Sequence, residues 1–340
     1  MIPANPHDGA ATGTAAQYPR RAFLASDAPI KVWAERAGLL VALALTIWFA
    51  ASLIMADWAG LSGLSPVRIV IACGLGAFAY AGLGVLLVLA WRKLLFGFGI
   101  DPVGHGRIYA LSQAFKYLPG NVMQFAGRHT MARKLGAPHR LLILAAASEA
   151  LLLLLAGATT SLLAGPGLAA GISATTGLPV PSFGVLIPAT LALLVAMLSV
   201  GRWLKHRLES NGITWAGLRT PALTAFGFYL TFFIGCGFVG FWLMVFALGT
   251  SAPILLLVAG ALAVSWTIGF LTPGAPAGLG VREVVLTTLL SPILGASGAL
   301  ALAALYRITT VAGDGLLAAA AFFGTSPHAA PLNPVLEAAR

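Results

Sequence analysis

Long apolar runs, separated by short segments that hold most of the charged residues, dominate this chain. A run of about 18 or more apolar residues is long enough to cross a bilayer as a helix. The pattern predicts seven such spans, over residues 39–56, 69–90, 141–163, 183–200, 223–248, 254–271 and 296–323. Residues 284–294 are apolar but too short to span and stop near Pro292, which is typical of a half-helix or re-entrant segment. We therefore expect an all-α integral membrane protein, a polytopic bundle of seven or, if the half-helix crosses, eight transmembrane helices.

The basic residues predict how this bundle is oriented. Most of them lie before the first span, in residues 91–140 and in residues 201–219, whereas the intervening loops 57–66, 164–182 and 249–253 hold none. Because basic loops stay in the cytoplasm, the N-terminus and residues 91–140 are expected on that side. We expect a disordered cytoplasmic tail over 1–36, a transmembrane domain over 37–324 and a C-terminal tail over 325–340. The side of the C-terminus depends on whether the half-helix crosses.

Composition narrows the function classes. The 340 residues are 59% hydrophobic and 9% charged, and the net charge is +10. Because the basic residues flank spans, topology and anionic lipids explain this charge, and nucleic acid is not expected as a partner. Cys73 and Cys236 lie inside apolar runs, and His105, His129 and His139 lack metal-ligand spacing and are interpreted as interfacial, so no metal or cofactor is expected. A nucleotide-binding loop is absent from the sequence, and no nucleophile–base pattern indicates an enzyme.

The segment over residues 272–283, Thr-Pro-Gly-Ala-Pro-Ala-Gly-Leu-Gly-Val-Arg-Glu, interrupts two apolar runs. Proline and glycine disfavour a continuous helix, and broken backbone beside membrane spans has to be buried in protein or line a wet cavity. Residues 117–128 repeat part of the pattern: in both segments Pro-Gly is followed, after seven residues, by an arginine. We interpret the pair as broken or re-entrant segments of an internal repeat with halves of about 37–165 and 221–324, although two Gly/Pro loops can also match by coincidence.

These motifs resemble the lysylphosphatidylglycerol synthetase/flippase-like transmembrane family. The resemblance rests on Pro-Gly followed by Gly-Leu-Gly-Val-Arg-Glu, on Lys116 to Gly120 with Gly127-Arg128, on Glu149, and on Tyr306-Arg307. It covers residues 39–323, but this chain inserts Ala275-Pro276-Ala277 where the family usually reads Pro-Gly-Gly-Leu-Gly. Because residues 324–340 are too few to form one, no soluble aminoacyl-transferase domain is expected after the last predicted span. The resemblance thus implies the lipid translocase part of that system, or a stand-alone relative.

The candidate chemistry is recognition of a lipid phosphate. Charges at membrane depth cost about 3 kcal/mol or more, and arginine binds phosphate in a bidentate way. We expect Arg128 and Arg282, with amides of the two Pro-Gly segments, to bind a phosphate-bearing headgroup. Glu149 and Glu283 would then balance these arginines or bind a cationic part of the headgroup. The alternative is that these charges form structural ion pairs. The predicted headgroup-binding residues are Lys116, Pro119, Gly120, Arg128, Glu149, Pro273, Gly274, Gly278, Gly280, Arg282, Glu283 and Arg307.

The expected function is therefore translocation of a polar or anionic lipid between the leaflets of a bacterial inner membrane, by a chain that is not an enzyme. Two alternatives remain open at this stage. One is a non-transporting accessory subunit for a glycosyltransferase or lipid-modifying enzyme, which would then be its partner. The other is an integral-membrane transferase that uses the same charges for chemistry. A homodimer is possible with any of them.

Overall fold

The computed structural model describes residues 65–117, 123–165, 205–210, 212–250, 255–273 and 275–324, together with 167–168, 173, 195, 199 and 201–202. The predicted tails, the span over 39–56 and nearly all of the span over 183–200 lie outside the described residues. So do Pro119, Gly120 and Gly274 of the predicted site. All elements within the described ranges are helices. They are α2 (Pro66–Gly97), α3 (His105–Ser112), η2 (Gln113–Tyr117), α4 (Met123–Lys134), α5 (His139–Leu163), α8 (Trp215–Trp242), η3 (Leu243–Ala247), α9 (Leu255–Leu271), η4 (Pro276–Gly278) and α10 (Val281–Phe323).

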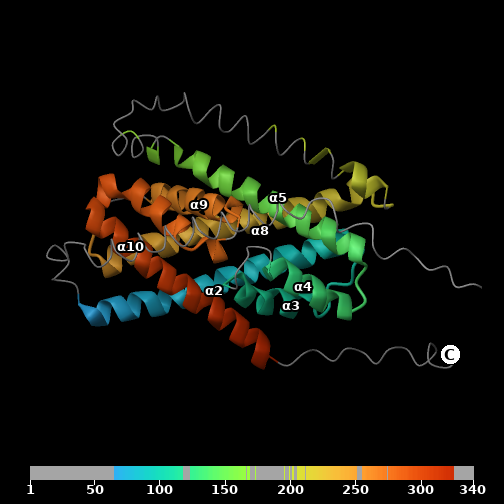
Figure 1. Cartoon of the computed structure of the whole chain (residues 1–340), viewed down its shortest axis with the longest axis horizontal. Coiled ribbons are helices and arrows are strands. Elements are labelled where there is room, and N and C mark those ends of the chain that lie inside the picture. Colours follow the sequence, from blue (N-terminus) through green and yellow to red (C-terminus); the bar gives the residue numbers. More distant parts are fainter. Residues whose placement is uncertain are drawn as a thin grey trace, which may run out of the picture.

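Four of the described helices are long and apolar enough to cross a membrane: α2, α5, α8 with its π-helical extension η3, and α10 with η4. This confirms an all-α protein of membrane type. The four coincide with predicted spans, because uninterrupted apolar runs of this length favour one outcome strongly. The fifth apolar helix, α9, has 17 residues and packs between α5, α8 and α10 (Figure 1).

Close contacts between small residues hold α9 in the bundle. A Cβ added to Gly237 of α8 would lie 2.3 Å from the Cβ of Ala259, and one added to Gly260 would lie 2.2 Å from the Cβ of Ala164. The helix backbones therefore approach closely at these points, as is common in membrane bundles.

The predicted break at residues 272–283 is present. Helix α9 ends at Leu271, and α10 begins at Val281 after the short turn η4. Three residues of this segment have positive φ: Ala277 at 50°, Gly278 at 69° and Gly280 at 79°. A helix cannot run through such backbone, so two apolar helices meet here at a tight turn.

Helix α10 consists of two legs. Its backbone continues through Pro292 and leaves helical geometry at Gly295, where φ is 70° and ψ is 165°. This break separates the predicted half-helix from the predicted last span. The second leg crosses the bundle (red in Figure 1), and its end lies against α3, where Arg107 Nη2 donates to the carbonyl of Phe322 at 3.1 Å.

The basic segment over residues 91–140 differs from the loop that the sequence indicated. It folds into α3, η2 and α4, which pack beside the end of α2 and the start of α5 (Figure 1). Six of its basic residues are exposed, whereas Arg128 is 3% exposed and Lys116 is half-buried. The charge of Arg128 is therefore paired inside the bundle and does not belong to the exposed basic surface of this segment.

Candidate functional site

A cavity lies in the middle of the bundle, between η2, α2, α8, α9, η4 and α10. It holds about 620 Å³ of empty space, the opening at its mouth included. Tyr80, on its wall, lies 14 residues after Pro66 and 17 before Gly97, so it is about 21 Å and 25 Å from the two ends of α2. A second lobe on the α4 and α5 side shares Tyr80, Lys116 and Arg282 with the first. The cavity thus lies near half-height of a membrane-length helix.

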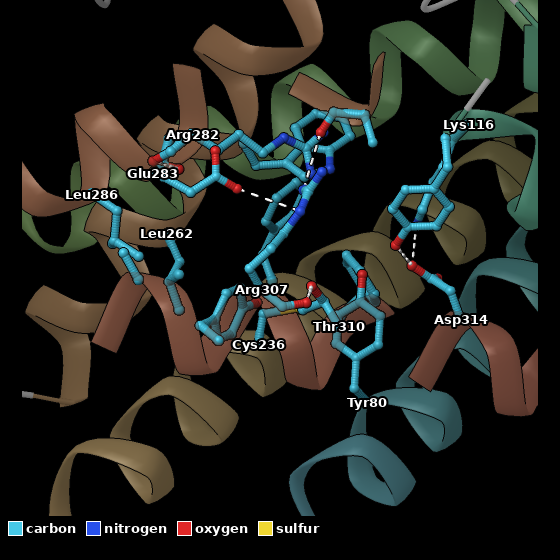
Figure 2. A pocket seen from close by; sticks show the side chains of 18 residues that line it. Tyr80, Lys116, Cys236, Leu262, Arg282, Glu283, Leu286, Arg307, Thr310 and Asp314 are labelled. Carbon is cyan, nitrogen blue, oxygen red and sulfur yellow. Dashed lines mark hydrogen bonds and ion pairs between the residues drawn. The ribbon is translucent and has the colours of Figure 1, made fainter. Parts of the chain in front are cut away.

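Seven charged side chains line the two lobes (Figure 2 shows those of the first). Four are cationic: Lys116, Arg128, Arg282 and Arg307. Three are anionic: Glu149, Glu283 and Asp314. Each carboxylate belongs to an ion pair, so the pairing decides which cation is available to a ligand.

Asp314 pairs with the end of η2. Lys116 Nζ lies 2.6 Å from Asp314 Oδ2, and the hydroxyl of Tyr117 donates to the same oxygen at 2.5 Å. Asp314 is 5% exposed and lies on the second leg of α10. The contact brings together two segments almost 200 positions apart in the sequence.

Arg307 holds the broken turn in place. Its Nε lies 3.4 Å from Glu283 Oε1, and its Nη1 donates to the carbonyl of Ala277 at 3.4 Å. The second oxygen of Glu283 and Nη2 of Arg307 are buried and lack a hydrogen-bond partner among the described residues. One arginine thus links the second leg of α10 to both η4 and the start of the first leg.

Arg128 and Glu149 form the most enclosed pair. Nη1 of Arg128 donates to Glu149 Oε1 at 3.0 Å, and Nη2 donates to Oε2. The guanidinium carbon lies 4.1 Å from the ring centre of Trp91 and 4.5 Å from that of Tyr109. Both side chains of the pair are at most 3% exposed. The carboxylate of Glu149 thus binds the edge of the guanidinium, while aromatic rings contact its faces. This arrangement fits the alternative in which the buried charges form structural ion pairs.

Arg282 is the exception. No carboxylate within the described ranges lies within ion-pair distance of it, and its Nε is buried without a hydrogen-bond partner. Its guanidinium carbon lies 5.6 Å from the ring centre of Trp266. Its stem passes between two glycines: an added Cβ would lie 2.5 Å from Arg282 Cγ at Gly269 and 2.6 Å from Nε at Gly278. Glycine is therefore required at both positions to admit this arginine.

The remaining predicted residues have different positions. Gly278 packs against Arg282, and Gly280, with φ of 79°, is the N-cap of α10. Pro273 is exposed and does not line the cavity. Helix η2, which ends at Tyr117, the first residue of the predicted segment 117–128, contacts η4 of the other predicted segment, whereas residues 118–122 lie outside the described residues.

The cavity residues that were not in the predicted site include Tyr80, Tyr117, Trp266 and Asp314. Asp314 carried a signal, since it is a carboxylate inside an apolar run. Tyr117 adjoins the predicted Lys116. Tyr80 and Trp266 carry no comparable signal, because an aromatic residue in a span is more often an anchor or a packing residue.

The histidines lie apart from the cavity. Nε2 of His129 and Nδ1 of His139 are 2.8 Å apart at an exposed contact between α4 and α5. Partial burial, together with His139 and Arg133 nearby, lowers the pKa of His129 below its ordinary value. His105 is buried at the start of α3. The described residues contain no group of three or more metal-ligating side chains.

The cavity therefore combines a mainly apolar lining with seven charged side chains, among which there is one cation in excess. Four cations face three carboxylates, and Arg282 is the one without a carboxylate among the described residues. Such a cavity can attract an anion and offer it a planar guanidinium. Neither the protein-family models nor the curated proteins compared with this sequence gave a match.

Proposed function

We propose that this protein is a membrane translocase that moves a polar or anionic lipid between leaflets of a bacterial inner membrane, with the headgroup phosphate held at Arg282. The observation that carries the proposal is the buried Nε of Arg282, which has no hydrogen-bond partner among the described residues and lies in a cavity at half-height of the bundle. A charged group at membrane depth is costly and marks a substrate or ion pathway by default. The other three cavity cations have carboxylate partners, so an anionic ligand would complete the pairing.

The broken backbone beside Arg282 supports a transport role. Helix α9 and the first leg of α10 have 17 residues and 14 residues, or about 25 Å and 21 Å of helix. Both lengths are below the roughly 30 Å of a hydrocarbon core. We propose that they form a re-entrant hairpin whose turn, η4, faces the cavity. Interrupted helices of this kind carry the substrate sites of many transporters near the bilayer midplane.

The first turn of α10 adds to the attraction for an anion. Arg282 is the second residue of this helix, after the N-cap Gly280. Amide groups in the first turn of a helix lack intrahelical partners and carry partial positive charge. Arg282 and the helix terminus thus act in the same direction, while Glu283 is already engaged by Arg307.

An apolar groove on the outer surface of the bundle supports a lipid as the substrate. The groove runs between α2 and α8 and is lined by Leu75, Gly76, Ala79, Leu83, Gly235, Phe238, Val239 and Trp242. In the proposed mechanism the acyl chains stay on such apolar surface while the headgroup passes through the polar cavity. The resemblance to the lysylphosphatidylglycerol synthetase/flippase-like transmembrane family points to the same substrate class.

The experiment is lipid translocation in proteoliposomes with leaflet-resolved detection. The wild type, Arg282→Ala and Arg140→Ala are reconstituted with fluorescent phosphatidylglycerol; Arg140 is the control because it is an exposed cation at the end of the bundle. We expect activity in the wild type and Arg140→Ala and its loss in Arg282→Ala. Equal activity in all three would refute the role of Arg282. A folded wild type with no activity above that of empty vesicles would favour the accessory subunit, and headgroup turnover would favour the transferase.

A further inference from the structure

The three ion pairs of the cavity differ in the number of additional contacts that fix each cation in place. Arg128 and Glu149 share two hydrogen bonds inside an aromatic cage. Arg307 also binds the carbonyl of Ala277. Lys116 instead contacts one oxygen of Asp314, and its Nζ lies 5.5 Å from the ring of Tyr117. It is therefore the cation that can change partner with the least disturbance of the fold.

Lys116 also has the right position for a second role. It lines both lobes of the cavity, as does Arg282, and it lies on η2, which contacts the broken turn η4. Its flexible four-carbon stem can reorient the ammonium group without moving a helix. An anion bound at Arg282 thus has a second cation within the same cavity.

Asp314 controls whether Lys116 is available. If Lys116 moved to an anion, the carboxylate would be left in the middle of the bundle, 5% exposed, and the Tyr117 hydroxyl would be its one remaining donor among the described residues. An uncompensated buried charge is strongly unfavourable, and such a carboxyl group takes up a proton instead. The other ionisable groups that face it are Tyr80 of α2, Cys236 of α8, and Tyr306 and Arg307 of α10.

We propose that Lys116 is a second ligand of the headgroup phosphate and that it leaves Asp314 when this carboxylate takes up one proton from solution. The proposal rests on the function proposed above. An O–H bond forms on Asp314 as the contact with Lys116 breaks, and the proton returns to solution when the phosphate leaves and Lys116 reforms its pair. One anionic lipid would therefore enter the site together with one proton, which couples translocation to a proton gradient.

The test is calorimetric titration of the full chain in detergent with dihexanoyl phosphatidylglycerol, in two buffers of equal pH and different ionisation enthalpy. The probe is a phosphodiester, which does not titrate near pH 7, so any proton taken up binds to the protein. We expect the wild type to take up about one proton per lipid and to bind up to about tenfold more tightly for each unit by which the pH falls. Asp314→Asn and Lys116→Met should bind with no proton uptake, since neither retains the exchangeable pair.

Glu209→Gln is the matched control. It removes the carboxylate of an exposed pair, Lys205 Nζ to Glu209 Oε1 at 3.8 Å, and should keep the wild-type proton uptake. The proposal is overturned if the wild type binds without proton uptake, or if Asp314→Asn takes up as many protons as the wild type. In those cases, sensitivity of binding to Arg282→Ala would leave the proposed function standing. Absence of binding to the folded wild type would overturn both.

Discussion

Replacing Glu149 with glutamine should destabilise the bundle far more than removing an exposed carboxylate. The partner, Arg128, is 3% exposed and keeps its charge, so the substitution leaves an uncompensated cation between aromatic rings. Breaking a buried ion pair from one side costs about 3–5 kcal/mol. Glu209→Gln, in a pair whose side chains are 54% and 53% exposed, should cost less than about 1 kcal/mol.

Unfolding in lipid bicelles by steric trapping measures this difference as a free energy. A double-mutant cycle sharpens the result: Arg128→Met combined with Glu149→Leu should recover most of the loss, because apolar residues of similar volume often replace a buried pair without penalty. If Glu149→Gln changed the free energy of unfolding by less than about 1 kcal/mol, Arg128 would not be locked by this carboxylate. It would then be available to a ligand, as the sequence-based prediction has it.

Two further predictions concern the broken turn and the histidine pair. Gly278→Ala should abolish translocation and destabilise the protein by about 1–3 kcal/mol, because φ is 69° and the new Cβ would lie 2.6 Å from Arg282 Nε. The control is Gly136→Ala, where φ is 85° and the space around the residue is open. This variant should have the same backbone strain but keep the activity. Activity lost equally in both variants would contradict this. The lowered pKa of His129 means that the unfolded chain binds more protons, so this residue contributes a loss of stability as the pH falls below about 6.5. The melting temperature of the detergent-solubilised wild type should therefore fall more between pH 7.5 and pH 5.5 than that of His129→Gln, and parallel curves would count against the role of His129.

Helices were predicted well from the sequence where a continuous apolar run alone determines the structure. Residues 141–163 and 223–248 are apolar over a length that only a membrane helix explains, and the structure has α5 and α8 with η3 there. Proline and glycine also predicted the break after α9, because their backbone preferences are local. The break at Gly295 follows from the same rule, since positive φ favours glycine.

The pairing of charges could not be read in this way. Lys116 and Arg128 were predicted to bind a headgroup, with Glu149 balancing an arginine. In the structure their partners are Asp314 and Glu149, which lie 198 and 21 positions away in the sequence. Only the fold shows that these two cations are neutralised and that Arg282 is not paired among the described residues. Arg128 and Arg282 are thus two arginines in similar motifs that differ in their pairing, and no local sequence pattern distinguishes them.

The most direct test of the central claim is a density map of the protein in nanodiscs that contain phosphatidylglycerol. We expect a phosphate peak within hydrogen-bond distance of the Arg282 guanidinium, between η4 and Trp266, and its absence from a map of Arg282→Ala. A lipid phosphate bound only at the basic end of the bundle, with the cavity around a well-ordered Arg282 holding water alone, would contradict it.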